Sequence, residues 1–309
     1  MALFYRSERE YLDSLVPLIS GWLSNAEPVL VAVPEDKIAL LQDAFGAPAG
    51  DVTVNLTMTD ITEAGRNPGR ILGLVADFMQ RHPHRPLHMI GEPVWPGRSD
   101  VEYPACVQHE ALVNIALAGH DVTGLCLYDA SRLGESVLAD ARLTHPLIWR
   151  DGWPQPNRDF ALDLALDHCN QPLPTDAGAM IYTVCEPADL AGARRCSARY
   201  GRLLGLSDEG IADLQLITTE LATSGLHHSG GACRIAFWHS DGHVVCEARY
   251  VGQLGDPLAG CRPPTAGSGE CELFVVNAVA DLVRTHTSPD GTTIHAYLRL
   301  DRFSEGGAP

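Results

Sequence analysis

Cys106 and His109 are the residues of the N-terminal half whose types and spacing are best suited to chemistry. They are three positions apart, so a helix places both on one face, with Glu110 beside them. A thiolate and an imidazole can bind a metal ion or haem, although two ligands do not complete a zinc site. They can also form a Cys–His hydrolase dyad, but helical spacing rarely supplies an oxyanion hole as well. In the third interpretation they belong to a rigid polar pocket, in which Cys106 only packs.

A run of aromatic and polar residues precedes this helix and extends the candidate site. Its densest part is Gly91–Arg98 (GEPVWPGR), which follows a predicted buried strand. Ligands of parallel sheets usually bind at the carboxyl ends of the strands. We therefore predict a sensor pocket there, lined by Tyr5, Glu92, Trp95, Arg98, Tyr103, Cys106, His109 and Glu110.

The C-terminal half carries a second polar row, Glu220, Ser224 and His228, spaced four residues apart. A helix places these three side chains on one face. A loop with Gly252 follows the next predicted hairpin, and a Gly/Ser segment follows that loop. Taken alone, such a row is typical of a solvated helix face, so its meaning depends on the pattern around it.

The composition excludes several classes of function. The net charge of −17 comes from 22 basic and 39 acidic residues, whereas a nucleic-acid-binding face is basic. Lys37 is the only lysine and is not part of a Gly-Lys-Ser/Thr tripeptide, so no phosphate-binding P-loop is present. The 9 cysteines form no Cys-x-x-Cys pair, which argues against a disulfide framework or a zinc ribbon. We expect no signal peptide, no membrane span and a cytoplasmic location, since charges interrupt the first residues and no apolar run reaches about 20 residues.

The order of the predicted elements indicates two domains, which is also the usual number for 309 residues. In residues 1–150, buried strands alternate with helices, as in an α/β domain whose mainly parallel sheet is covered on both faces. The predicted strands are 28–33, 52–56, 87–91 and 123–128, and the predicted helices are 35–45, 68–81 and 103–118.

Residues 151–178 contain two proline clusters around a short helix-like run and are predicted to be a linker. Residues 179–301 have the pattern of an α+β two-layer sandwich with helices on one side of a mixed sheet, and 302–309 form a tail. The predicted strands here are 180–185, 233–238, 244–249, 282–287 and 292–300, and the helices are 187–204, a second one from 207 and a third at 273–281.

Residues 178–300 resemble the histidine-kinase-like ATPase domain (the Bergerat or GHKL fold) of the anti-sigma-factor serine kinases. The resemblance implies an ATP site in which one helix supplies a Glu as general base and, four residues later, an Asn that holds Mg²⁺. An Asp-x-Gly then binds the adenine, and a glycine-rich lid covers the phosphates. The motifs that carry the resemblance are Thr219–Thr223 (TELAT), His228–Gly231 (HSGG), Cys246–Arg249 (CEAR), Asp256–Leu258 (DPL), Val276-Asn277 and Gly291–Thr293 (GTT).

This ATP site departs from the family pattern. Glu220 and Gly252 are kept, but Ser224 replaces the Asn and Tyr250 replaces the Asp. Ser is a weaker Mg²⁺ ligand than Asn, and a Tyr ring would fill the adenine cavity. We therefore predict that ATP and Mg²⁺ bind weakly or not at all, and that Glu220 is a vestigial base. The residues of the degenerate ATP site are Ser224, His228, Tyr250, Gly252, Gly267, Gly269, Thr292 and Thr293.

The N-terminal cluster, together with Phe4–Ser7 and Tyr11, resembles the MEDS (methanogen/methylotroph sensory) domain over about residues 1–150. That resemblance implies a small-molecule sensor with a RecA-like fold that lacks the phosphate loop. It agrees with the missing Gly-Lys-Ser/Thr tripeptide, and it does not specify the ligand.

The two resemblances together predict a sensor–effector transcriptional regulator of the anti-sigma type. The N-terminal domain would bind an unknown small molecule. The C-terminal domain would bind a sigma factor or a STAS-type anti-anti-sigma protein without phosphorylating it, with a homodimer left open. One alternative is an active ATP-dependent protein-serine kinase, and another is a metal or redox sensor that uses Cys106 and His109. The arginine-rich composition indicates a GC-rich, actinobacterial source.

Overall fold

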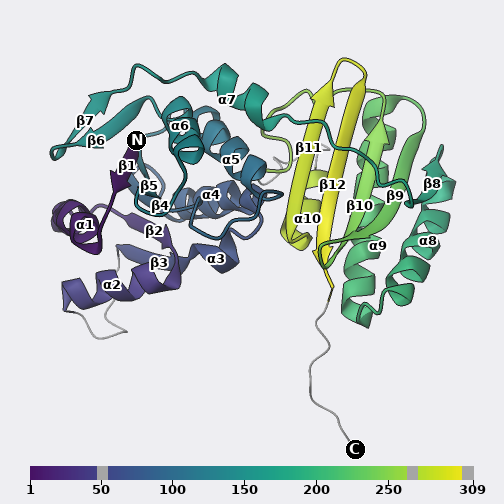
Figure 1. The fold of residues 1–309 in the computed structure, drawn as a ribbon, viewed down its shortest axis with the longest axis horizontal. Helices are drawn as coiled ribbons and strands as arrows, with labels where there is room; N and C mark the ends of the chain where they lie inside the picture. The colour runs from purple at the N-terminus through teal and green to yellow at the C-terminus, as the bar shows by residue number, and fades with distance from the viewer. Residues whose placement is uncertain (47–54, 263–270, 301–309) are drawn as a thin grey trace, which may run out of the picture. The chain divides into compact units, whose positions relative to one another are not determined.

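The computed structural model describes residues 1–46, 55–262 and 271–300, and the chain forms two compact units (Figure 1). The first unit comprises Met1–Cys169 and the second Asn170–Pro309. Each unit is built on one β-sheet. No helix in the described ranges combines the length and the apolar character that a membrane crossing needs.

The first unit contains a seven-stranded sheet in the order β3-β2-β4-β5-β1-β6-β7. Neighbouring strands are parallel except for the last pair, in which β7 is antiparallel to β6. The predicted mainly parallel sheet is therefore confirmed. The strands are β1 Ala2–Tyr5, β2 Val29–Val33, β3 Leu56–Asp60, β4 Leu87–Gly91, β5 Val122–Asp129, β6 Leu147–Arg150 and β7 Trp153–Pro156.

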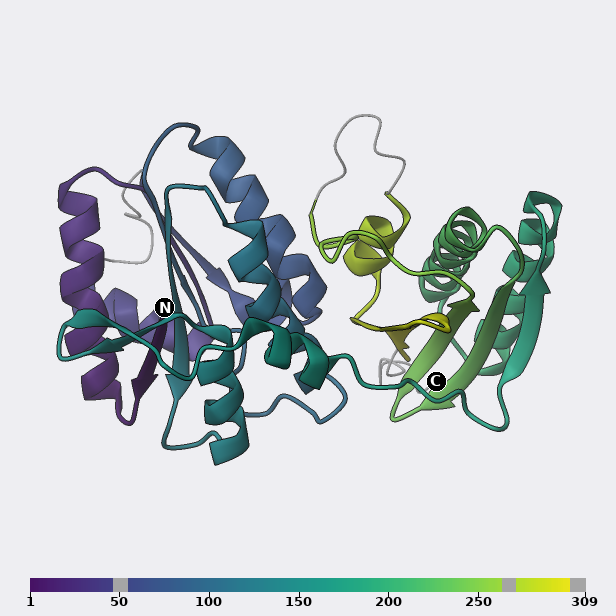
Figure 2. The same ribbon diagram turned by 90° about the horizontal axis from the view of Figure 1, so that it is seen from above.

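Helices cover both faces of this sheet, because successive strand residues point to opposite sides and both sides are apolar. In β2, Val29, Val31 and Val33 pack against α1 and α2, whereas Leu30 packs against α4 and Ala32 against α3 and α4. Figure 2 shows α1 on one side of the sheet and the blue helices α4 and α5 on the other. The helices are α1 Glu8–Ser24, α2 Glu35–Phe45, α3 Ile61–Ala64, α4 Ile71–Arg81, preceded by the 3₁₀ turn Pro68–Arg70, α5 Tyr103–Ala116, α6 Glu135–Thr144 and α7 Leu162–Cys169.

The expected linker at 151–178 differs from the structure over its first part, which belongs to the first unit. Trp153–Pro156 forms strand β7, and Leu162–Cys169 forms α7, which packs against α5 and α6. Proline is tolerated in β7 because this is an edge strand with only one neighbour, so the missing N–H groups leave no gap in the ladder. The strand expected at 52–56 lies mostly outside the described residues, and the observed β3 begins at Leu56.

The second unit contains a five-stranded sheet in the order β11-β12-β10-β9-β8 with helices α8, α9 and α10 packed on one face. Every pair of neighbouring strands is antiparallel, so the expected mixed sheet is wrong. Strand β9 follows β8 after two helices, and hairpins join β9 to β10 and β11 to β12. Helix α10 lies between β10 and β11 in the chain, and β12 separates these two strands in the sheet. The elements are β8 Met180–Val184, the 3₁₀ turn Pro187–Asp189, α8 Leu190–Leu203, α9 Asp208–Ser229, β9 Cys233–Ser240, β10 His243–Tyr250, α10 Glu272–Val279, β11 Leu282–Ser288 and β12 Gly291–Arg299.

The other face of this sheet is crossed by the extended segment 170–178, drawn in teal in front of the strands (Figure 1). Asn170 hydrogen-bonds to the backbone of Thr287, and Arg249 donates to the carbonyl oxygen of Leu173. The second half of the expected linker is thus a strap fixed to the second unit.

Glu247 of β10 lies beneath this strap and is fully buried. The Thr175 hydroxyl donates to its carboxylate at 2.7 Å, Arg234 Nη1 donates at 2.7 Å, and His295 Nε2 lies at 3.0 Å. Burial raises the pKa of Glu247, but its hydrogen bonds with His295 and Thr175 and the charges of His295 and Arg249 outweigh burial and lower it. A buried carboxylate that is satisfied from three sides therefore joins the strap to the sheet.

We expect Glu247→Gln to lower the free energy of unfolding of the second unit by about 3 kcal/mol, because it leaves buried partners unpaired. The folded pKa of Glu247 is depressed, so its contribution is present at neutral pH and is lost as the pH falls below about 4.3. Chemical denaturation at pH 7 and at pH 3 should show a gap between variant and wild type that shrinks in acid. Asp290→Asn, at an exposed turn, is the control, and an equal gap for both variants would contradict this role.

Candidate functional site

The carboxyl ends of the parallel strands bring three polar side chains of the first unit together. Tyr5 ends β1 and Asp129 ends β5, and the two are register partners. Glu92 directly follows β4, the neighbour of β5 on its other side. This is the edge of the sheet at which α/β proteins bind their ligands.

A buried carboxyl and two tyrosines form the centre of this strand-end site. The Tyr5 hydroxyl donates to Glu92 Oε1 at 2.7 Å, and Glu92 is 1% exposed. Among the described residues, Glu92 Oε2 and the Tyr11 hydroxyl are buried without a hydrogen-bond partner. The Tyr11 ring packs edge-on against Tyr5 with centroids 5.0 Å apart. A ligand that donates to Glu92 and bonds to Tyr11 would satisfy both groups.

Burial and nearby charges set the pKa of Glu92 in the strand-end site. Burial raises the pKa of Glu92 to about 7, against the Tyr5 hydrogen bond and the charge of Lys37, which lower it. Lys37 Nζ lies 5.4 Å from the ring centre of Tyr5 and 5.3 Å from that of Tyr11. Asp129 is held by Ser131, whose N–H and hydroxyl both donate to Oδ1. The carboxyl of Glu92 can therefore gain or lose a proton near neutral pH when a ligand changes its surroundings.

Trp95 and Arg98, which were predicted to line the same pocket, stack on each other beside it. The guanidinium carbon of Arg98 lies 3.6 Å from the centre of the Trp95 ring. Arg98 donates to the carbonyl oxygens of Pro93, Arg66 and Gly65, so its donors are taken by the backbone. This arginine fixes the loop after β4.

Tyr103 and Glu110 lie deeper, between α5 and the sheet, and line a separate cavity of about 10 Å³. The Tyr103 hydroxyl donates to Asp140 at 2.7 Å. Burial raises the pKa of Glu110, but the hydrogen bond and charge of His145 and the charge of His109 outweigh burial and lower it to about 2. Six of the eight predicted pocket residues are thus spread over three places in the first unit.

Cys106 and His109 are both buried on α5, and neither has the protonation state that a nucleophilic dyad needs. Burial raises the pKa of Cys106 to about 12, so the thiol stays protonated. Burial lowers the pKa of His109 to about 4. Within the described residues, no third His, Cys, Asp or Glu completes a metal-ligand group with this pair.

The second unit brings Ser224, His228 and Tyr250 together, and the first and third of these are buried in its core. The Tyr250 and His228 rings stack with centroids 6.2 Å apart, and His228 Nδ1 bonds to the carbonyl oxygen of Ser224 at 2.8 Å. Glu220 is half-buried one turn earlier on α9. Burial, followed by the charge of Glu272, raises its pKa, and Arg194 opposes the shift.

The backbone conformation at position 252 requires glycine. Its φ is +134°, and a Cβ atom there would lie 2.5 Å from the carbonyl oxygen of His228. Thr292 donates to the carbonyl oxygen of Gly252 at 2.8 Å. Thr293 points to the opposite face of β12, because consecutive strand residues alternate. Gly267 and Gly269 lie outside the described residues.

Residues 1–146 match the family model of the MEDS domain, described as the methanogen/methylotroph, DcmR sensory domain. The first unit carries a MEDS domain. The matched range ends just before β6, so the strand-end site lies in the MEDS domain, as do Tyr103 and Glu110 of α5. No curated protein is similar enough to the chain to be matched.

Sequence reasoning had named Tyr5 and Glu92 but not Lys37 or Asp129 as members of the strand-end site of the MEDS domain. Asp129 was detectable, because it directly follows the predicted strand 123–128. Lys37 was detectable only as the single lysine of the chain, which is no structural signal. Its place in the first turns of α2, just after β2, brings it to the same edge.

Glu92→Gln should remove a pH dependence from the stability of the MEDS domain. The folded pKa of Glu92 is raised, so wild type loses stability relative to the variant as the pH rises from about 4.3 to about 7. At about 1.4 kcal/mol per pKa unit, the change is roughly 4 kcal/mol. Denaturation curves of both proteins between about pH 4.3 and pH 7 measure this change in the free energy of unfolding. Glu63→Gln on α3 is the control for the loss of one exposed charge. Parallel stability profiles for wild type and Glu92→Gln would place the titration elsewhere.

Proposed function

We propose that the chain is a sensor–effector regulator of the anti-sigma type. Its MEDS domain binds a small polar molecule at the ends of β1, β4 and β5. Its second unit is a degenerate histidine-kinase-like ATPase domain that binds a sigma factor or a STAS-type protein without phosphorylating it. The match of residues 1–146 to a sensory family carries the sensor half of this proposal.

The strand-end site supports a ligand of particular chemistry. A buried carboxyl with a pKa near 7, an unpaired tyrosine hydroxyl and a nearby ammonium group favour a small molecule that both donates and accepts hydrogen bonds. A phosphate-bearing ligand is disfavoured, since the loop after β1 is only Arg6-Ser7 and Glu92 and Asp129 face the same edge. The RecA-like relationship would then concern the fold and not nucleotide binding.

Packing around Tyr250 supports the loss of ATP binding. Its ring is 3% exposed and belongs to the core cluster formed by β9, β10 and α9. In the family that the sequence resembles, the adenine-binding Asp occupies this position. An adenine ring would have to displace a core side chain, at a cost of several kcal/mol.

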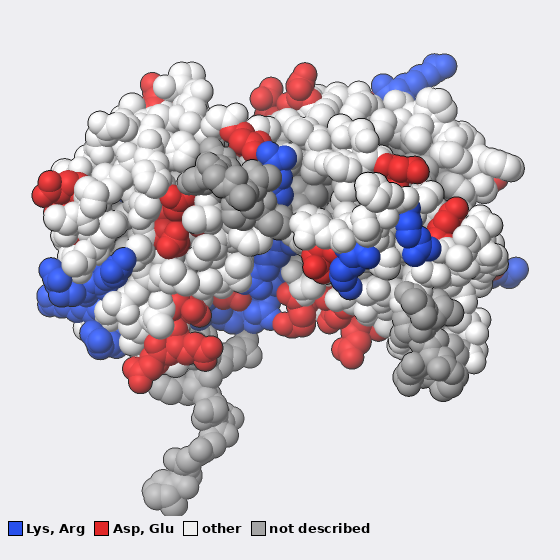
Figure 3. Space-filling model, turned by 180° about the vertical axis from the view of Figure 1, so that it is seen from behind, with Lys and Arg blue, Asp and Glu red and all other residues white. Residues whose placement is uncertain are grey.

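A basic stripe on α8 supports the proposed binding of a protein partner. Arg195, Arg199 and Arg202 are exposed and lie at helical spacing on one face, beside Leu203, which is 72% exposed. Figure 3 shows basic side chains gathered at the side of the second unit where α8 lies. On a chain of net charge −17, this stripe offers an acidic partner surface a local attraction.

Calorimetry of the full chain with ATP and Mg²⁺ should show no saturable binding, because Tyr250 fills the position of the adenine and Ser224 is buried away from solvent. The same protein incubated with labelled ATP and purified STAS proteins should transfer no phosphate to serine. A micromolar dissociation constant, or ATP-dependent labelling of a STAS protein, would establish the active serine kinase instead.

Reversing two charges of the stripe, Arg195→Glu with Arg199→Glu, should weaken binding to a purified sigma factor or STAS protein by at least tenfold. Wild-type affinity should fall with added salt, and the variant should lose most of that dependence. Arg150→Glu with Arg158→Glu, exposed in the first unit, is the matched control. Equal affinities for the two double variants would exclude α8 as the partner surface, and no binding to either protein class would refute the anti-sigma function.

A further inference from the structure

A second polar cluster of the MEDS domain lies apart from the strand-end site. Glu110 of α5, Cys126 of β5 and His145 at the end of α6 each offer one ligand atom, and these atoms lie within 4.8 Å of one another. Glu110 and His145 are almost completely buried, and Glu110 Oε2 lies 3.2 Å from His145 Nε2. Three different elements thus deliver a carboxylate, a thiol and an imidazole to one point.

The imidazole of His145 is oriented as in metal-binding histidines. Its Nδ1 lies 2.8 Å from the carbonyl oxygen of Ala141, which can only accept, so Nδ1 carries the proton. Nε2 is therefore the atom that faces Glu110. A backbone carbonyl that holds the far nitrogen fixes both the tautomer and the ring, which is the usual arrangement behind a metal ligand.

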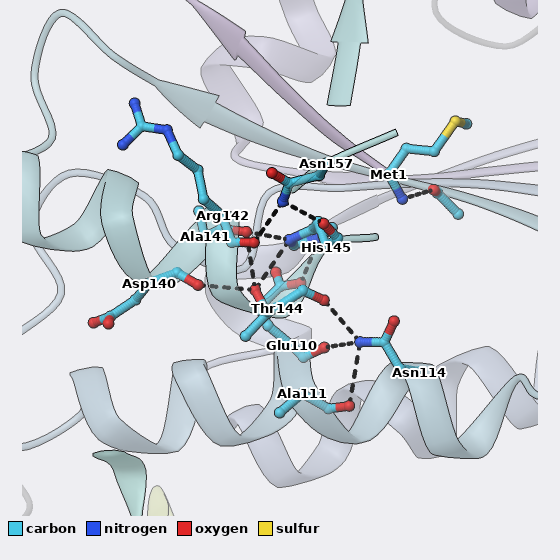
Figure 4. Close-up of polar contacts among 11 residues, drawn as sticks. Met1, Glu110, Ala111, Asn114, Asp140, Ala141, Arg142, Thr144, His145 and Asn157 are labelled. Atoms are coloured by element: carbon cyan, nitrogen blue, oxygen red, sulfur yellow. Dashed lines mark hydrogen bonds and ion pairs between the residues drawn. The ribbon is translucent and has the colours of Figure 1, made fainter. Parts of the chain in front are cut away.

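Two asparagines fix the backbone on which these side chains stand (Figure 4). Asn114 Nδ2 donates to the carbonyl oxygens of Glu110 and Thr144, which joins α5 to the end of α6. Asn157 Nδ2 donates to the carbonyl oxygens of His145 and Arg142. The cluster is therefore held in place before any ligand arrives.

Space for a further ligand adjoins the carboxylate. Glu110 and Tyr128 line the cavity of about 10 Å³, which is enough for about one water molecule. The Tyr128 side chain is 1% exposed, and its hydroxyl interacts with the Glu110 carboxylate. A buried hydroxyl and a buried carboxylate beside such a cavity favour an occupant that can accept or donate a hydrogen bond.

We propose that the MEDS domain binds one divalent ion of the zinc class through Glu110 Oε2, Cys126 Sγ and His145 Nε2, with water as the fourth ligand. Bonds of about 2.0 Å at a tetrahedral angle separate two ligand atoms by about 3.3 Å, close to the distance between the Glu110 and His145 atoms. The site differs from the Cys106–His109 pair that the sequence suggested, although Glu110 adjoins both.

The ligand set selects among metals. A thiolate with an imidazole favours Zn²⁺ over Mg²⁺ and Ca²⁺, which prefer oxygen ligands throughout. Three protein ligands with one open position match the class of zinc site that exchanges a water molecule. The site would thus be a binding centre of the sensory domain in its own right, and it does not depend on the partner of the second unit.

The test uses the untagged full chain, stripped of metal with a chelator and titrated with Zn²⁺. We expect one ion per chain by elemental analysis after gel filtration and a rise in unfolding temperature. Cys126→Ala keeps the Glu110–His145 pair, and it should weaken Zn²⁺ binding at least a hundredfold. With Co²⁺ as probe, wild type should show a thiolate-to-metal charge-transfer band that Cys126→Ala lacks.

Cys106→Ala is the matched control, since Cys106 is a buried cysteine of the same domain outside the cluster. It should keep both the stoichiometry and the Co²⁺ band. Circular dichroism of both metal-free variants checks that each is folded, and Cys126→Ser replaces Cys126→Ala if the latter is not. Less than half an ion per chain in wild type, or equal Zn²⁺ affinity in the two cysteine variants, would overturn the site and leave a buried ion pair.

Discussion

Helices cover both faces of the first sheet, and helices on one face with the segment 170–178 on the other bury most of the second. This constraint decides where chemistry can occur. A polar group between the layers has no access to water, so leaving it unpaired costs at least about 1 kcal/mol. In the described parts of the chain, buried charges accordingly have partners, as Glu247 has in the second unit. In the MEDS domain, incompletely satisfied groups remain at the strand ends, where Glu92 and Tyr11 lie, and under α5, where Glu110 lies. A ligand or ion gains most at these two places.

The same constraint leaves no open cavity around Tyr250 in the second unit. The antiparallel register pairs Tyr250 with Cys233 on one side and Thr292 on the other, and it directs the Tyr250 ring toward α9. There Gly225 leaves room for it: a Cβ at that position would lie 3.2 Å from the ring and still closer to Cys233. The Tyr250 ring therefore completes the core of the second unit. Removing the ring would take away part of the packing that holds α9 to the sheet.

The sequence was most informative where one element carries its own pattern. The apolar run Val29–Val33 and helix Glu35–Phe45 could be predicted almost to the residue, because continuous burial and helical spacing are local signals. Strand β1 is only four residues long and gives no such signal, and the proline-bearing β7 imitates a linker. The same contrast between local signals and packing applies to the site residues. Glu92 could be found from the end of its strand, whereas the meeting of Glu110 with His145 depends on how α5 and α6 pack.

The connection between the two units is very short. Helix α7 packs against α5 and α6 up to Cys169, and the next residue, Asn170, is already hydrogen-bonded to Thr287 of the second unit. The proline-rich residues 151–178, which the sequence predicts to be a linker, are thus divided between the units. Any change of orientation must be absorbed by a few backbone bonds near this junction. To change partner affinity tenfold, the sensed molecule must favour one orientation by about 1.4 kcal/mol. A single hydrogen bond to a group such as Glu92, made in one orientation and lost in the other, is of that size.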